Sequence, residues 1–228
     1  TVDRVGVDGL LSELDEYAIE EALTIEGASE STVTVVCMGP EQAADAIRKA
    51  LQMGADAGVH ICDDALAGSD ALATSRVLAA AIRTLEYDLV LTGMASTDGL
   101  MSVVPAMLAQ QLGLPQVTFA GKVSFDGSIV RIERDGDTST EVIEASLPAL
   151  VSVTDQINEP RYPSFKGIMA AKKKPVTTLS LADLGISADA VGLAAAWTTV
   201  ESVEARPPRA AGQRITDEGD GGARLVEY

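Results

Sequence analysis

Short β-branched runs alternate with helical stretches along the first half of the chain, and this alternation constrains the fold more than any other feature. Residues 32–38, 58–62 and 88–92 predict buried strands, because short apolar runs rich in Val, Ile and Thr suit strands covered on both faces. Helices are predicted over residues 40–53, 69–85 and 98–112. The alternation favours an α/β fold with a three-layer, Rossmann-like parallel sheet and helices on both faces. Ligands of such sheets bind beyond the carboxyl ends of the strands.

The pattern changes after Pro115. Residues 117–124 and 129–134 flank Phe125-Asp126-Gly127-Ser128, a hairpin signal, and residues 138–145 alternate as a further strand would. These segments predict an antiparallel β addition, and the apolar residues 147–153 then predict another buried strand.

The last forty residues show no sustained periodicity. We therefore divide the chain into an α/β domain over residues 1–186 and an extended C-terminal arm over residues 187–228. Such an arm is expected to be ordered only on a partner.

The charge and the residue inventory exclude several classes of function. A net charge of −17 argues against a nucleic-acid partner, and no apolar run approaches the roughly 18 residues of a membrane span. Cys37 and Cys62 are too few for a disulfide framework or a cysteine zinc site, and they suit buried thiols in a reducing cytoplasm. The single histidine, His60, lies in a strand pattern and is expected to be structural. We therefore expect neither a metal site nor enzymatic chemistry of the chain's own.

Residues 158–175 stand out in this acidic chain. They combine Pro160 and Pro163, an exposed-looking aromatic residue, Gly167 and a run of three lysines. A segment of this composition typically serves a partner.

Four ordered motifs carry a family resemblance. Asn158-Glu159-Pro160-Arg161-Tyr162-Pro163, followed by Gly167-Ile168-Met169-Ala170-Ala171-Lys172-Lys173-Lys174, resembles the signature of electron transfer flavoprotein β subunits. Residues 15–23, 50–56 and 147–149 match the same family pattern. The resemblance covers residues 12–185.

The resemblance implies a carrier subunit rather than an enzyme. An α subunit would hold most of the FAD, and this chain would support it in a heterodimer while binding a structural AMP. The assembly would take electrons from acyl-CoA dehydrogenases and pass them to a membrane quinone oxidoreductase. The alternative is a stand-alone adenine-nucleotide sensor on the same sheet. An amidohydrolase or ligase of the related nucleotide-binding superfamily is excluded, because the sequence contains neither the phosphate loop nor the base that such an enzyme needs.

The resemblance also assigns the AMP site. Its residues here are Ser12, Glu13, Leu14, Asp15, Met38, Gly93, Met94, Ala95, Ser96, Thr97, Asp98, Gly99, Leu100, Met101, Ser102, Val103 and Val104. The loop after Gly93 leads into a predicted helix N-terminus, where backbone amides suit a phosphate, and Asp98 is expected to cap that helix or to contact ribose or adenine.

Two departures from the family pattern bear on this site. The usual opening strand, which contributes to the nucleotide pocket, is missing from the sequence, and Gly99-Leu100-Met101 replaces an acidic cluster. We therefore expect the backbone contacts to AMP to remain, without the side-chain contacts of that acidic cluster.

The family precedent makes Phe165 the anchor that docks on a dehydrogenase. The partner-binding set is Arg161, Tyr162, Phe165, Ile168 and Met169. The alternative is that Phe165, Ile168 and Met169 only pack their helix on the chain's own core. Arg161 is expected to contact either the α subunit or Glu159, and Lys172, Lys173 and Lys174 to form the solvated end of their own helix.

Overall fold

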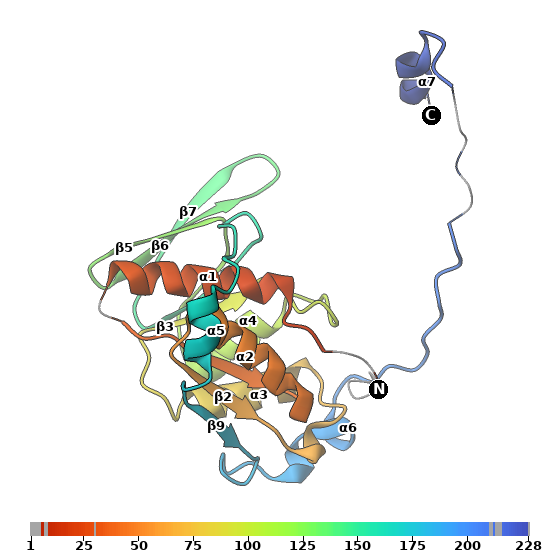
Figure 1. Ribbon diagram of the computed structural model, residues 1–228. Helices are drawn as coiled ribbons and strands as arrows, with labels where there is room; N and C mark the ends of the chain where they lie inside the picture. Colours follow the sequence, from red (N-terminus) through yellow and green to blue (C-terminus); the bar gives the residue numbers. More distant parts are fainter. Residues whose placement is uncertain (1–5, 7–8, 30, 210–211, 213–215, 228) are drawn as a thin grey trace.

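Two parallel three-stranded sheets form the centre of the molecule (Figure 1). The computed structural model describes residues 6, 9–29, 31–209, 212 and 216–227. The first sheet has the order β1-β2-β9, from Thr34–Met38, Ala57–Ile61 and Val176–Leu179. The second has the order β3-β8-β4, from Leu89–Gly93, Ala149–Val153 and Gln116–Ala120. The expected parallel strands are confirmed, but the single continuous sheet is not, since no ladder joins the two sheets within the described residues.

The antiparallel addition is confirmed as a third sheet. It comprises β5 Lys122–Asp126, β6 Ile129–Asp135 and β7 Thr140–Ser146, with the β5–β6 turn at Gly127 in the left-handed region that glycine favours. The expected single strand over residues 117–124 is wrong, because β4 ends at Ala120 and a bend at Gly121 separates it from β5; the register of β4 also shifts between Val117 and Ala120.

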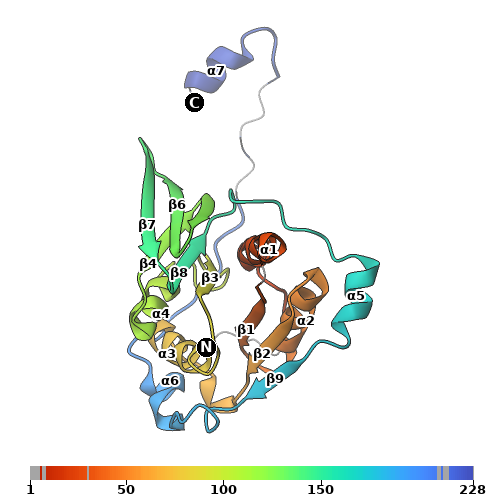
Figure 2. The same ribbon diagram turned by 90° about the vertical axis from the view of Figure 1, so that its left-hand side faces the viewer.

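The helices cover the parallel sheets from two sides (Figure 2). α1 (Glu13–Ala28) packs on β3 and β8, and α2 (Ala44–Met53), which follows the 3-10 turn Glu41–Ala43, packs on β1 and β2. α3 (Ala71–Ile82) contacts β1, and α4 (Val104–Leu112) contacts β8 and β4.

Local signals explain where several helices begin and end. The Asp70 carboxylate accepts a hydrogen bond from the Ala73 N–H at 2.9 Å and so caps α3, while Gly113, in the left-handed conformation, ends α4. Ser12 occupies the N-cap position of α1 but makes no side-chain cap bond. α4 begins at Val104, so the predicted start near Asp98 is wrong, and residues 98–103 are loop.

The core consists of several clusters of buried side chains around the parallel strands. All five residues of β8 are buried, and Leu150 and Val151 are fully inaccessible to solvent. Ile47, Leu51 and Val77 complete the packing from the helices. Each such side chain contributes roughly 1.5–3 kcal/mol to folding.

Packing on the α/β domain continues past residue 187, where the arm is predicted to begin. The 3-10 turn Ala188–Ala190 and α6 (Gly192–Ala195) pack on the domain, and Val191 is only 2% exposed. Asp70 also accepts a hydrogen bond from the Trp197 N–H at 2.8 Å. The chain leaves the body only after Thr198 and, as Figure 1 shows, runs outward to α7 (Gly221–Glu227).

No helix in the described part of the chain is long and apolar enough to cross a membrane.

Candidate nucleotide site and docking helix

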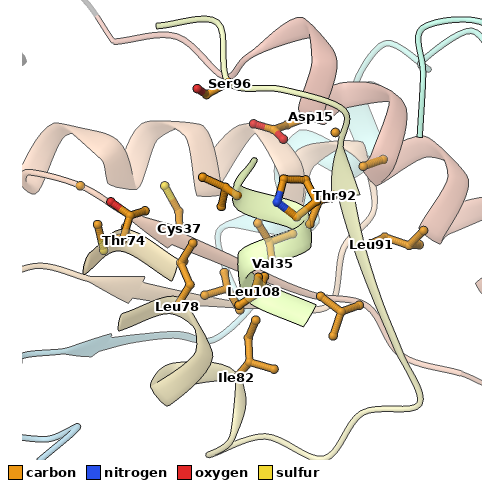
Figure 3. A pocket seen from close by; sticks show the side chains of 18 of the residues that line it. Asp15, Val35, Cys37, Thr74, Leu78, Ile82, Leu91, Thr92, Ser96 and Leu108 are labelled. Carbon is orange, nitrogen blue, oxygen red and sulfur yellow. The ribbon is translucent and has the colours of Figure 1, made fainter. Parts of the chain in front are cut away.

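A cavity of about 3430 Å³ opens between the two parallel sheets. Figure 3 shows Val35 and Cys37 from β1 and Leu91 and Thr92 from β3 around it. Further lining side chains come from α1, α3 and α4, namely Asp15, Ala18, Leu78, Ile82 and Leu108. The cavity therefore continues from an apolar interior to polar loops at the carboxyl ends of β1 and β3.

Most of the predicted AMP-binding residues line this cavity. Those that do are Asp15, Met38, Gly93, Ala95, Ser96, Asp98, Gly99, Met101, Ser102, Val103 and Val104. Ser12, Glu13, Leu14, Met94, Thr97 and Leu100 are not among the lining residues. The structure thus gathers at one place segments that lie far apart in the sequence.

Close backbone contact joins the start of α1 to the end of β3. The Ser12 and Thr97 hydroxyls lie 2.7 Å apart and form a hydrogen bond. A Cβ on Gly93 would lie 2.7 Å from the Leu14 carbonyl oxygen and 3.0 Å from Asp15 Oδ1, so only glycine fits here without a shift of the backbone.

Burial raises the pKa of two titratable groups at the cavity. Burial raises the pKa of Asp15, and a hydrogen bond from the Gly93 N–H only partly offsets this effect. Burial, with added repulsion from Asp15, raises the pKa of the Cys37 thiol to about 11.

The loop after β3 has an unusual backbone. Leu100 and Ser102 have φ values of 54° and 55°, and the Ser96 hydroxyl accepts a hydrogen bond from the Gly99 N–H at 3.1 Å. The loop ends at the N-terminus of α4, where Val103, rather than Asp98, is the N-cap residue. The first turn of α4 offers the N–H groups of Val104 and Ala106, because Pro105 has none and the Met107 N–H donates to the Val103 carbonyl.

Sequence reasoning missed Thr92. Its Oγ1 is buried and has no hydrogen-bond partner in the structure, and the side chain faces the cavity beside Asp15 (Figure 3). A buried hydroxyl without a partner is costly, which fits a polar group bound in the cavity. In the sequence, Thr92 reads only as one more β-branched strand residue.

The apolar part of the cavity is bounded by two unpaired strand edges. β1 pairs only with β2, and β3 pairs only with β8, among the residues that the structure describes. The free edges of β1 and β3 both border the cavity, with α1 on one face and α3 and α4 on the other. Strands on both sides and helices on both faces are the surroundings of a buried parallel strand.

A second candidate site lies on α5 (Phe165–Ala171). The Ser164 hydroxyl caps this helix by accepting a hydrogen bond from the Gly167 N–H at 3.0 Å. Phe165 is 81% exposed and Tyr162 is 96% exposed, while Ile168 and Met169 are about 38% and 49% exposed. Packing of Phe165 into the chain's own core is therefore excluded.

Arg161 is bound within its own chain. Its guanidinium forms two hydrogen bonds to the Glu20 carboxylate, at 2.7 and 2.8 Å, so neither Glu159 nor a partner is needed to explain it. The Asn158 side-chain amide donates to the Tyr17 carbonyl and to Glu21, at 3.1 and 3.2 Å. The segment that precedes α5 is thereby fixed on α1.

The expectation for the lysine run is wrong for Lys174. Lys172 is the C-cap residue of α5, but Lys174 Nζ donates to the carbonyl oxygens of Leu51, Gly54 and Ala55, at the end of α2. Lys174 therefore caps a helix far from its own in sequence.

His60 is buried, and its Nε2 lies 3.2 Å from the Gly39 carbonyl oxygen, which confirms a structural histidine. Within the described residues, no cluster of three or more His, Cys, Asp or Glu side chains could hold a metal ion.

These features define an α/β protein with a cavity at the carboxyl ends of its parallel strands and, packed on α2, a helix with exposed apolar side chains. The model of the Electron transfer flavoprotein domain matches residues 1–184. The chain belongs to the electron transfer flavoprotein family, as a beta subunit.

Curated relatives agree over nearly the whole chain. The electron transfer flavoprotein subunit beta of Mycobacterium tuberculosis strain H37Rv is 51% identical over 234 residues, which cover 100% of this chain and 88% of the relative. The subunit beta of Thermoanaerobacterium thermosaccharolyticum is 38% identical, over 95% of this chain and 84% of the relative. The caffeyl-CoA reductase-Etf complex subunit CarD of Acetobacterium woodii is also 38% identical, over 95% of this chain and 83% of the relative.

Proposed function

We propose that the chain forms a heterodimer with an α subunit and carries electrons from acyl-CoA dehydrogenases to a membrane quinone oxidoreductase, in fatty-acid β-oxidation. The α subunit holds most of the FAD, which supplies the redox chemistry when bound. The chain itself contributes binding and docking, and we place it in the cytoplasm. The relative named as part of a caffeyl-CoA reductase complex supports a coenzyme A thioester oxidoreductase as one partner class.

The docking helix is the observation that carries this proposal. Phe165 projects from α5 with 81% of its surface exposed, and Tyr162, just before α5, is 96% exposed. An exposed aromatic residue on a fixed helix is a costly feature for a solitary protein, and it suits an anchor that fills a partner's pocket. Met169, one helical turn further along, extends the same surface.

We further propose that AMP binds at the carboxyl ends of β1 and β3. The close contact at Gly93, the raised pKa of Asp15 and the unpartnered hydroxyl of Thr92 support a ligand there. Backbone amides in the first turn of α4 suit the phosphate.

The apolar part of the cavity has a different role in this proposal. A further parallel strand, contributed from outside the described residues, would pair with the free edges of β1 and β3. Its support is the pair of unpaired edges and the helices on both faces. This strand corresponds to the opening strand of the family pattern.

The C-terminal arm of this chain is proposed to contact the α subunit. Val200, Val203, Leu225 and Val226 are each more than two-thirds exposed, and α7 makes no buried contact of its own. An arm of this kind suits wrapping round a partner.

The test is the cofactor content and the docking of the purified complex. Co-expression with the α subunit is expected to give a yellow heterodimer with one FAD and one AMP, and two FAD would refute the AMP assignment. Phe165→Ala is expected to raise the KM for the carrier in an acyl-CoA dehydrogenase assay at least about tenfold, with unchanged cofactor content. An unchanged KM would refute the docking assignment.

A further inference from the structure

Helix α5 cannot hold its shape alone. It has seven residues and none of them is buried. Isolated helices shorter than roughly 12–15 residues are marginal in water. The orientation of Phe165 must therefore come from contacts between α5 and the rest of the protein.

The sequence of α5 separates an inner face from an outer face. Gly167 and Ala171, four residues apart, lie on α2, where Ala171 packs against the cluster of Ile47, Leu51 and Ala55. Phe165 and Met169 lie on the opposite face of the helix and are exposed. Small residues thus let the helix lie close to the body while large residues point outward.

Gly167 sets the distance between α5 and α2. A Cβ at this position would lie 2.4 Å from the Gln52 carbonyl oxygen, which belongs to the last turn of α2. Even alanine would push α5 away, because the obstructing atom is backbone.

Lys174 fixes the other end of the segment. Its ammonium group has three N–H donors, and they reach the carbonyl oxygens of Leu51, Gly54 and Ala55 at 3.2, 2.5 and 2.6 Å. α2 has no basic residue in its own last turn, so Lys174 supplies the cation that complements the dipole at this end.

We infer that Gly167 and Lys174 are positioning residues of the docking surface, which hold α5 against the end of α2 so that Phe165 is presented in one orientation. This inference rests on the proposed docking role of Phe165. A preorganised anchor loses less conformational entropy on binding than a mobile one, so loosening α5 weakens docking and leaves electron transfer in the docked complex intact.

The test uses the FAD-containing heterodimer, a purified acyl-CoA dehydrogenase and its acyl-CoA substrate. Lys174→Met removes the three donors and keeps much of the side-chain volume, while Lys173→Met removes an exposed neighbouring charge and serves as the matched control. Lys174→Met is expected to raise the KM for the carrier about fivefold with kcat within about twofold, and to speed amide hydrogen exchange over residues 158–176. Lys174→Arg is expected to give a KM and an exchange rate between those of the wild type and of Lys174→Met. Lys173→Met is expected to leave both at their wild-type values.

Gly167→Ala gives an independent route to the same effect, because it acts by displacement and removes no charge. Unchanged exchange over residues 158–176, or faster exchange with an unchanged KM in both variants, would overturn the inference. Equal KM changes in Lys174→Met and Lys173→Met would also overturn it, since charge alone would then explain the effect. Failure of Phe165→Ala to raise KM would instead refute the proposed docking role.

Discussion

Arg161 and Glu20, which lie 141 positions apart in the sequence, form a two-point ion pair that ties the segment before α5 to α1. The Arg161 N–H also donates to the same carboxylate, at 3.0 Å. Glu20 is 8% exposed, so this carboxylate is largely shielded from water. The pair therefore links the helix beside the cavity to the segment that leads into the docking helix.

The first prediction concerns Glu20→Gln. Burial alone would raise the pKa of Glu20, but hydrogen bonds and charge from Arg161 outweigh burial and lower the pKa below its ordinary value of 4.5. The substitution removes the ion pair and is expected to lower the free energy of unfolding by about 1–2 kcal/mol at pH 7. The loss is no larger because water around the exposed part of Arg161 screens the pair. Urea unfolding measures this loss.

The pH dependence checks the same prediction. A lowered carboxyl pKa stabilises the fold above pH 4.5, and this stabilisation is lost as the pH falls through the lower, folded-state pKa. The difference between wild type and Glu20→Gln should therefore shrink below pH 4.5. Glu144→Gln, which breaks an exposed pair with Arg131, is the control and is expected to cost less than about 0.5 kcal/mol. A pH-independent difference would contradict the role of the ion pair.

The second prediction concerns Gly93→Ala. A Cβ would meet the Leu14 carbonyl oxygen at 2.7 Å, so the end of β3 and the start of α1 must separate. We expect a loss of about 1–3 kcal/mol in the free energy of unfolding and substoichiometric AMP in the purified heterodimer, with FAD retained. Acid release followed by chromatography measures both nucleotides.

Gly27→Ala is the control for Gly93→Ala. Gly27 lies in α1, and a Cβ there meets no atom within 4 Å. Alanine is expected to leave the AMP content unchanged and to stabilise the helix slightly. Full AMP occupancy in Gly93→Ala would contradict the placement of the nucleotide.

The sequence predicts the elements better than their assembly. The strands at residues 34–38, 57–61 and 89–93 follow from β-branched runs, and the antiparallel sheet follows from the turn at Gly127. The predicted start of α4 at Asp98 is wrong, because Asp98 resembles an N-cap residue in the sequence. Leu100 and Ser102 have positive φ values, which no local sequence pattern indicates, and the helix therefore begins only at Val104.

The candidate site was predictable only in part. Motifs placed the loops around Gly93 and the aromatic anchor Phe165, and the structure brings those loops to one cavity and exposes that ring. The partners of Arg161 and Lys174 could not be predicted, since each lies more than 100 residues away and a charged side chain carries no signal of its partner. Thr92 could not be predicted as a site residue either, because threonine is common in buried strands. Only the structure shows that its hydroxyl has no hydrogen-bond partner.

The third prediction concerns Asp70→Ala. Burial alone would raise the pKa of this carboxyl. Hydrogen bonds from the N–H groups of Ala73, Trp197 and Thr198 outweigh burial and lower the pKa below 3.8. Removal of the carboxylate is expected to cost about 1 kcal/mol through the lost cap of α3, and to free the chain around Trp197. Trp197 is the only tryptophan, so its fluorescence anisotropy should fall. Asp70→Asn keeps an acceptor oxygen and should retain most of the stability and most of the Trp197 anisotropy. Equal anisotropy in the wild type, Asp70→Ala and Asp70→Asn would contradict this anchoring role.

The fourth prediction concerns the two thiols. Burial, with repulsion from Asp15, raises the pKa of Cys37 to about 11, so at pH 8 only about one thousandth of it is thiolate, against about a quarter of a free cysteine. Burial and the nearby carboxylates of Glu41, Asp64 and Asp63 also raise the pKa of Cys62. A disulfide reagent at pH 8 should therefore modify both thiols more slowly than free cysteine.

Single-cysteine variants separate the two thiols. In Cys62→Ser the remaining Cys37 should react at least about a hundredfold more slowly than free cysteine, and faster as the pH approaches 11. In Cys37→Ser the remaining Cys62 should also react more slowly than free cysteine, because burial and the nearby carboxylates raise its pKa. If Cys37 in the native heterodimer reacts as fast as free cysteine, its placement beside Asp15 in the cavity is wrong.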